Sequence, residues 1–150
     1  MKFSDVIIAA ASLFVISLII DVFLTVGLVG WNTLWDEPVS VIIAVLATSL
    51  VIGYVFALKI QEGSRVGAIW SIVVLNTALL MIFTAAFFAI PTASPAIKDV
   101  MQRIFSTSGW TDYDWYAYIA LFQIVFMVLS LVLSFIGLYA GSMLRKPKKT

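Results

Sequence analysis

The segment VISLIIDVFLTVG, Val15 to Gly27, places an aspartate in the middle of an apolar run. The run extends over residues 6–30, and a helix that crosses the hydrocarbon core of a bilayer needs about 20 apolar residues. Three further apolar runs of sufficient length cover residues 39–60, 66–90 and 115–144. The sequence therefore predicts a bundle of four transmembrane helices, with Asp21 inside the first of them.

The composition supports a membrane location for the whole chain. Only 11% of the 150 residues are charged, 63% are hydrophobic, and the mean hydropathy is +1.11. A soluble domain of this length needs much more polar surface. The four runs lack the alternating pattern of a membrane barrel, and the first run is longer than the apolar part of a signal peptide. We therefore expect one all-α integral membrane domain over residues 1–150, with the first helix retained.

The distribution of basic residues predicts how the four helices are oriented. In the four-helix arrangement one side of the membrane carries Lys2, Lys59, Arg65, Arg145, Lys146, Lys148 and Lys149, and the other side carries only Lys98 and Arg103. Cytoplasmic loops are enriched in Lys and Arg. Both termini are therefore expected in the cytoplasm, and the expected location is the plasma membrane of a prokaryote.

The outer connection between the third and fourth helices has a helical pattern of its own. Ser94 is a candidate N-cap and Pro95 suits a first helical position. One face then carries Ile97, Val100, Met101, Ile104 and Phe105. This spacing predicts a short amphipathic helix over residues 95–105. It either lies flat on the outer membrane surface or covers the end of the bundle.

Polar side chains inside the predicted helices form a layer around Asp21. Asp21 lies nine residues before Gly30, which corresponds to about 13 Å below the outer boundary. Thr48, Thr84 and Gln123 lie at similar predicted depth, and Ser17 and Thr25 share the helical face of Asp21. A second layer, about 21–23 Å from the outer boundary, contains Tyr54, Asn76 and Ser130.

The Asp21 carboxylate has three possible roles in the membrane. It is an ion or proton site, it forms an interhelical hydrogen bond with Gln123, Thr84 or Thr48, or it pairs with a basic residue of another subunit. The two structural readings are preferred, because Asp21 is accompanied by several hydroxyl and amide groups.

Small residues also recur at helical spacing. Ser49, Gly53 and Ala57 follow one another at intervals of four in the second helix, and Gly137 and Gly141 repeat this spacing in the fourth. Small residues allow helix backbones to approach closely in a membrane. The Ser49–Gly53–Ala57 ridge therefore predicts a packing surface, either within the chain or toward another subunit.

Several function classes are disfavoured. The chain has no Cys and no His, which excludes thiol chemistry, the usual zinc sites and ordinary haem ligation. No basic stripe for nucleic acid occurs outside the C-terminal tail. No catalytic residue, metal or cofactor is predicted, and the expected partners are membrane lipids and other membrane subunits. The predicted function is that of a non-catalytic accessory or structural subunit of a larger membrane complex. The alternative is a small oligomeric cation- or proton-coupled transporter or channel that uses Asp21.

Overall fold

The computed structural model describes residues 1–24, 36–61, 63–93, 109 and 111–145. This part of the chain is 92% helical and contains no strand, which confirms the all-helical prediction. The elements are α1 (Phe3–Val22), α2 (Asp36–Val55), α3 (Ala57–Gln61), α4 (Arg65–Ala93) and α6 (Asp112–Leu144). The predicted amphipathic helix over residues 95–105 lies outside the described residues.

Three of the helices are long and apolar enough to cross a membrane. They contain the stretches Phe3–Val22, Arg65–Ala86 and Ile124–Leu144. Helix α2 contributes a shorter apolar stretch, Val39–Val55. These helices indicate a membrane protein.

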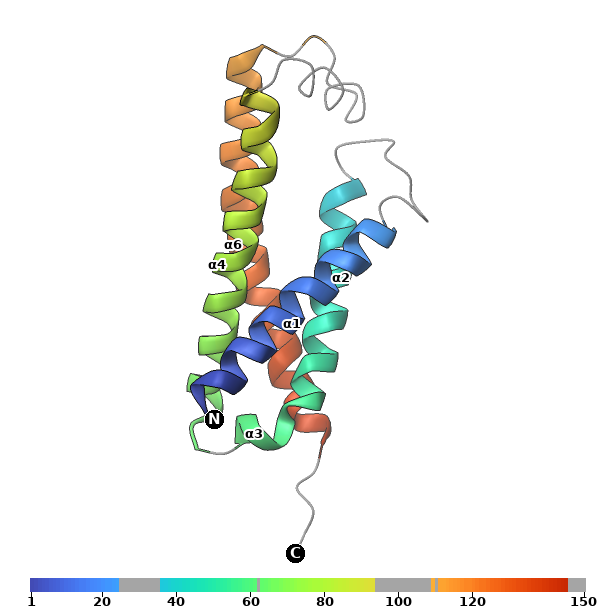
Figure 1. Cartoon of the computed structure of the whole chain (residues 1–150). Coiled ribbons are helices and arrows are strands. Elements are labelled where there is room, and N and C mark those ends of the chain that lie inside the picture. The colour runs from blue at the N-terminus through green and yellow to red at the C-terminus, as the bar shows by residue number, and fades with distance from the viewer. Residues whose placement is uncertain (25–35, 62, 94–108, 110, 146–150) are drawn as a thin grey trace, which may run out of the picture.

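The second predicted helix, 39–60, is divided in the structure. A turn at Phe56 separates α2 from α3. Backbone hydrogen bonding nevertheless continues through the turn, because Phe56 N donates to Ile52 O at 2.9 Å and Ile60 N donates to Phe56 O at 2.9 Å. Figure 1 shows that α3 runs in a different direction from α2. The backbone groups at the turn between them remain paired.

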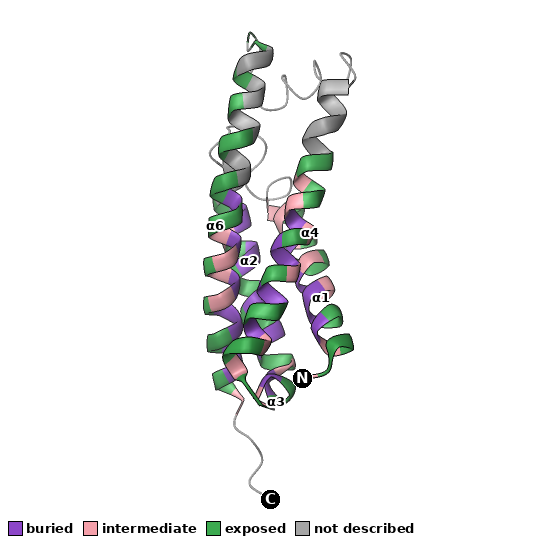
Figure 2. Ribbon diagram, turned by 90° about the vertical axis from the view of Figure 1, so that its left-hand side faces the viewer, coloured by how far each residue is buried: buried purple, intermediate pink, exposed green. Residues whose placement is uncertain are grey.

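The long helices pack side by side around a common interior. Figure 1 shows α4 and α6 next to each other, with α1 running obliquely beside α2. Met1, α3 and the last turn of α6 lie at the same end of the molecule, which we call the α3 end. Figure 2 shows the buried residues on the inward sides of the helices. Fully buried side chains of this interior include Leu13, Ile69, Ile72, Val73 and Leu138.

The outward sides of the helices are apolar as well. Ile19 of α1, Ile82 of α4 and Leu121 of α6 are each more than 60% exposed. A helix that is hydrophobic on all sides suits a lipid environment, in which apolar side chains need no cover.

Polar contacts tie the elements together at the α3 end. Lys59 of α3 forms an ion pair with Asp5 of α1. Gln61 Nε2 donates to Ser142 O at 2.7 Å and to Arg145 O at 3.3 Å. The final carbonyls of a helix have no partner within the helix, so Gln61 supplies a donor where α6 ends. The turn at Phe56 thus places α3 between the start of α1 and the end of α6.

The start of α6 is fixed by a capping box. Thr111 Oγ1 accepts a hydrogen bond from Asp114 N at 3.3 Å, and the Asp114 carboxylate accepts from Thr111 N at 2.8 Å. The Thr111 hydroxyl also donates to this carboxylate at 2.6 Å. These bonds lower the pKa of Asp114 below its ordinary value of 3.8. Asp114 lies ahead of Ile124–Leu144, the apolar stretch of α6.

Replacement of Thr111 by Ala is expected to increase fraying at the start of α6 at neutral pH. A carboxylate whose pKa is lower in the folded state stabilises the fold above its unfolded pKa, and this contribution disappears as the pH falls through the folded value. The difference between wild type and Thr111→Ala should therefore shrink as the pH falls below 3.8 and through the lowered pKa of Asp114 in the folded state. Hydrogen exchange of the amides in the first turn of α6 measures the effect, with Thr111→Ser as a control that keeps the hydroxyl. Equal exchange in wild type and Thr111→Ala at pH 7 would contradict this role.

Candidate functional site

Asp21 joins the end of α1 to the beginning of α2. It stands one residue before the end of α1, and Ser40 lies in the second turn of α2. Ser40 Oγ donates to Asp21 Oδ1 at 2.5 Å. This distance is at the short end of the range for hydrogen bonds between two oxygen atoms. Ser40 is buried, whereas Asp21 is partly exposed.

The depth predicted for Asp21 differs from its place in the structure. Ser40 and Thr48 are eight residues apart on α2, or about 12 Å along the helix axis. Asp21 therefore lies beside the first turns of α2, about two helical turns from Thr48 along that helix. That depth was counted from Gly30, whereas α1 ends at Val22 and residues 25–30 lie outside the described part.

Ser40 is not among the partners predicted from the sequence, because it stands at the edge of an apolar run. No local pattern in the two apolar runs marks Ser40 as the partner of Asp21.

The other predicted members of the layer have separate surroundings. Ser17 Oγ donates to Phe14 O at 3.0 Å, and Thr84 Oγ1 donates to Leu80 O at 2.8 Å, each within its own helix. Thr48 is buried, and its hydroxyl has no hydrogen-bond partner among the residues that the structure describes. Thr25 and the side chain of Gln123 lie outside the described residues.

A second polar group connects α4 to α6 in the interior. Thr77 Oγ1 and Ser130 Oγ are 3.2 Å apart, and Asn76 Nδ2 donates to Ser134 Oγ at 3.4 Å. All four residues are buried, and Asn76 Oδ1 has no hydrogen-bond partner. The structure thus brings Asn76 close to the level of Ser130, as the second predicted layer requires.

Tyr54, the remaining member of the second predicted layer, lies apart from this group. Its side chain is 47% exposed, and the Arg145 guanidinium lies 5.7 Å from the centre of its ring. The structure therefore places it on the outside of the bundle, near the α3 end.

The two series of small residues contact each other between α2 and α6. Ser49, Gly53 and Ala57 are buried, and Ser49 Oγ lies within hydrogen-bonding distance of Leu133 O, at 3.4 Å. A Cβ atom on Gly53 would lie 2.5 Å from Leu138 O. From α6, a Cβ atom on Gly137 would lie 2.8 Å from Ser49 Cβ, and one on Gly141 would lie 2.9 Å from Tyr54 N. The sequence leaves open whether the ridge packs within the chain or on another subunit, and the structure places Ser49 and Gly53 against α6 of the same chain.

The hydrogen bonds of these hydroxyl, amide and carboxylate groups connect helices or lie within one helix. In the part of the chain that the structure describes, no three His, Cys, Asp or Glu side chains gather where they could bind a metal ion. Comparison with protein-family models, curated proteins and solved structures gives no match. The fold and the apolar helices therefore define the class, an all-helical membrane protein.

Proposed function

We propose that the chain is a four-span, non-catalytic membrane protein that serves as an accessory or structural subunit of a larger membrane complex. The fourth span is α2. Its 17-residue apolar stretch, Val39–Val55, is about 25 Å long, close to the hydrocarbon thickness of about 30 Å. The start of α1 and the end of α2 lie at the same end of the molecule (Figure 1), so a chain that crosses along α1 returns along α2.

The charge distribution supports an orientation for this bundle. Lys2, Lys59, Arg65 and Arg145 belong to the segments that meet at the α3 end. Because Lys and Arg gather on the cytoplasmic side, the α3 end faces the cytoplasm. Both termini then lie inside, in the plasma membrane of a prokaryote.

The hydrogen bond between Ser40 and Asp21 is the observation that carries the structural role. A carboxylate within an apolar helix is costly unless it has a partner or a function. Here Asp21 accepts a hydrogen bond from Ser40 of the adjacent helix in the same chain. The Thr77–Ser130 contact likewise uses polar groups to join helices. Such bonds support a rigid bundle, which suits a subunit whose task is to occupy a fixed place in an assembly.

The outer faces of the bundle supply the surface on which such an assembly would form. Val15 and Ile19 of α1, and Phe23 at its C-cap, are each between 48% and 64% exposed. In a membrane, helices associate through packing and hydrogen bonds because lipid gives no hydrophobic drive between them. A row of large side chains on an outward face offers packing contacts to a neighbouring subunit.

The proposal predicts a stoichiometric partner in native membranes. The chain, tagged at its C-terminus and expressed from its own promoter, is solubilised in a mild detergent and separated by native electrophoresis. Mass spectrometry then identifies the proteins that migrate with it, and an unrelated tagged membrane protein of the same host is the control. We expect the chain in a band larger than its own 16.5 kDa and its detergent, with the same partner in repeated preparations. Migration as a lone monomer would contradict the proposal.

A further inference from the structure

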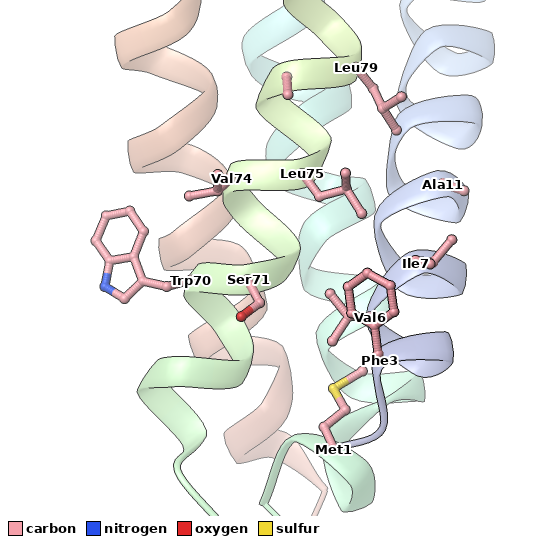
Figure 3. A pocket seen from close by; sticks show the side chains of 11 residues that line it. Met1, Phe3, Val6, Ile7, Ala11, Trp70, Ser71, Val74, Leu75 and Leu79 are labelled. Carbon is pink, nitrogen blue, oxygen red and sulfur yellow. The ribbon is translucent and has the colours of Figure 1, made fainter.

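An apolar groove lies between α1 and α4 at the α3 end. It has a volume of about 960 Å³. Figure 3 shows Met1 and Phe3 at its lower end, and Leu75 and Leu79 of α4 pointing toward α1. Ser71 is the polar member of the lining, and its hydroxyl donates to Gly67 O at 2.9 Å within α4. The groove wall is therefore apolar over its length.

The length of the groove matches half of a membrane. Its lining on α4 extends from Trp70 to Leu79, and its lining on α1 from Met1 to Ala11. At 1.5 Å per residue the nine steps on α4 cover about 13 Å, whereas the hydrocarbon core is about 30 Å thick. A transmembrane helix from a partner needs a surface over the whole thickness. A groove of this length suits a chain that enters from one side and ends near the middle, as the acyl chain of one leaflet does.

The open end of the groove is positively charged. Lys2 is exposed and lies between the two lining residues Met1 and Phe3. Asp5, one turn further along α1, forms an ion pair with Lys59. Arg65, which begins α4, lies over the ring of Tyr139 of α6 at 6.0 Å, so Lys2 is the basic residue beside the groove lining. Basic residues outnumber acidic ones at this end even when Glu62 of the α3–α4 connection is included.

We propose that this groove binds a phospholipid of the cytoplasmic leaflet with an anionic headgroup. One acyl chain lies between α1 and α4, and the phosphate lies beside Lys2. This inference rests on the membrane orientation given under Proposed function, and it is independent of the partner complex.

The test measures the thermal stability of the purified chain in dodecylmaltoside micelles with added lipid. Dioleoylphosphatidylglycerol is compared with dioleoylphosphatidylcholine, and glycerol 3-phosphate serves as a headgroup without acyl chains. A ligand at 100 times its dissociation constant raises the melting temperature of a protein of this size by roughly 5 to 10 °C. We expect this rise with the anionic lipid, a smaller rise with the neutral lipid and none with glycerol 3-phosphate.

Two kinds of variant locate the binding site. Ala78→Phe on α4 and Ala11→Phe on α1 fill the groove from opposite walls and should remove the rise produced by the anionic lipid. Ala140→Phe is the matched control, because Ala140 is exposed on α6 away from the groove. Lys2→Gln should weaken binding of the anionic lipid about fivefold, since a basic residue at the membrane surface contributes about 1 kcal/mol toward anionic lipid. Lys2→Arg should restore it.

Each arm has an outcome that overturns the proposal. If the anionic and the neutral lipid raise the melting temperature equally, the groove does not select an anionic headgroup and the proposal is wrong. If the anionic lipid raises the melting temperature of both Ala78→Phe and Ala11→Phe as much as that of wild type, the lipid does not bind in the groove. Either result leaves the partner complex untouched, because the measurement uses the chain alone.

Discussion

Replacing Gly53 by Ala is expected to destabilise the bundle by about 2–3 kcal/mol, because overpacking a closed contact forces the backbone to move. The added Cβ atom would lie 2.5 Å from Leu138 O and 2.8 Å from Leu138 Cα. Both are atoms of the main chain of α6, so no side-chain rotation relieves the clash. Equilibrium unfolding in mixed micelles with increasing dodecyl sulfate measures the loss of stability.

Gly67→Ala is the matched control for this prediction. Gly67 also lies in a helix, and it is exposed. The atom nearest to its added Cβ is Ser64 Oγ at 3.2 Å, a side-chain atom that accepts a hydrogen bond from Gly67 N and can shift by a few tenths of an ångström without losing it. Because Ala favours a helix over Gly by about 1 kcal/mol, Gly67→Ala should leave stability unchanged or raise it. If Gly53→Ala and Gly67→Ala behave alike, the close contact between α2 and α6 is not what limits stability.

The second large effect is expected at the contact between Asp21 and Ser40. Removing the hydroxyl in Ser40→Ala and the charge in Asp21→Asn should each lower stability, and the two losses should not add. A double-mutant cycle is expected to give a coupling energy of about 1–2 kcal/mol, at the upper end for hydrogen bonds between membrane helices because the Ser40–Asp21 contact is short. Ser142→Ala is the control, because the Ser142 hydroxyl donates to Tyr139 O of its own helix, far from Asp21. Additive losses would show that the two side chains do not stabilise the hairpin jointly.

The Asp21→Asn variant also separates the structural role from transport. Reconstituted in liposomes with a pH-sensitive dye inside, wild type and Asp21→Asn are expected to show the same background proton leak. A proton or cation flux that is present in wild type and lost in Asp21→Asn, with the fold retained, would favour the transporter instead. Ser40→Ala further distinguishes the structural role of Asp21 from a transport role. This variant loses the hydrogen bond between α1 and α2 but keeps the Asp21 carboxyl group that a transporter would use.

The amino-acid sequence alone determined the membrane class and the helical fold. Apolar runs of 20 or more residues admit few structures in lipid, because every backbone polar group must be satisfied within its own helix. The same reasoning recovers α1, α4 and α6, and it identifies Ser49 and Gly53 as a packing surface. These features depend on local composition and spacing, which the sequence displays directly.

Only the tertiary structure decided which polar groups meet. Asp21 accepts a hydrogen bond from Ser40, a residue that is not among the partners predicted for it, and the ridge on α2 faces Gly137 and Gly141 of its own chain. The turn at Phe56, which carries Gln61 to the end of α6, also has no local signal. The physical reason is geometric. Depth counted along a helix assumes that the helices are parallel and end at known residues, whereas α1 runs obliquely and ends at Val22. The angle and end of each helix follow from how all of them pack together, and a one-dimensional pattern does not contain that information.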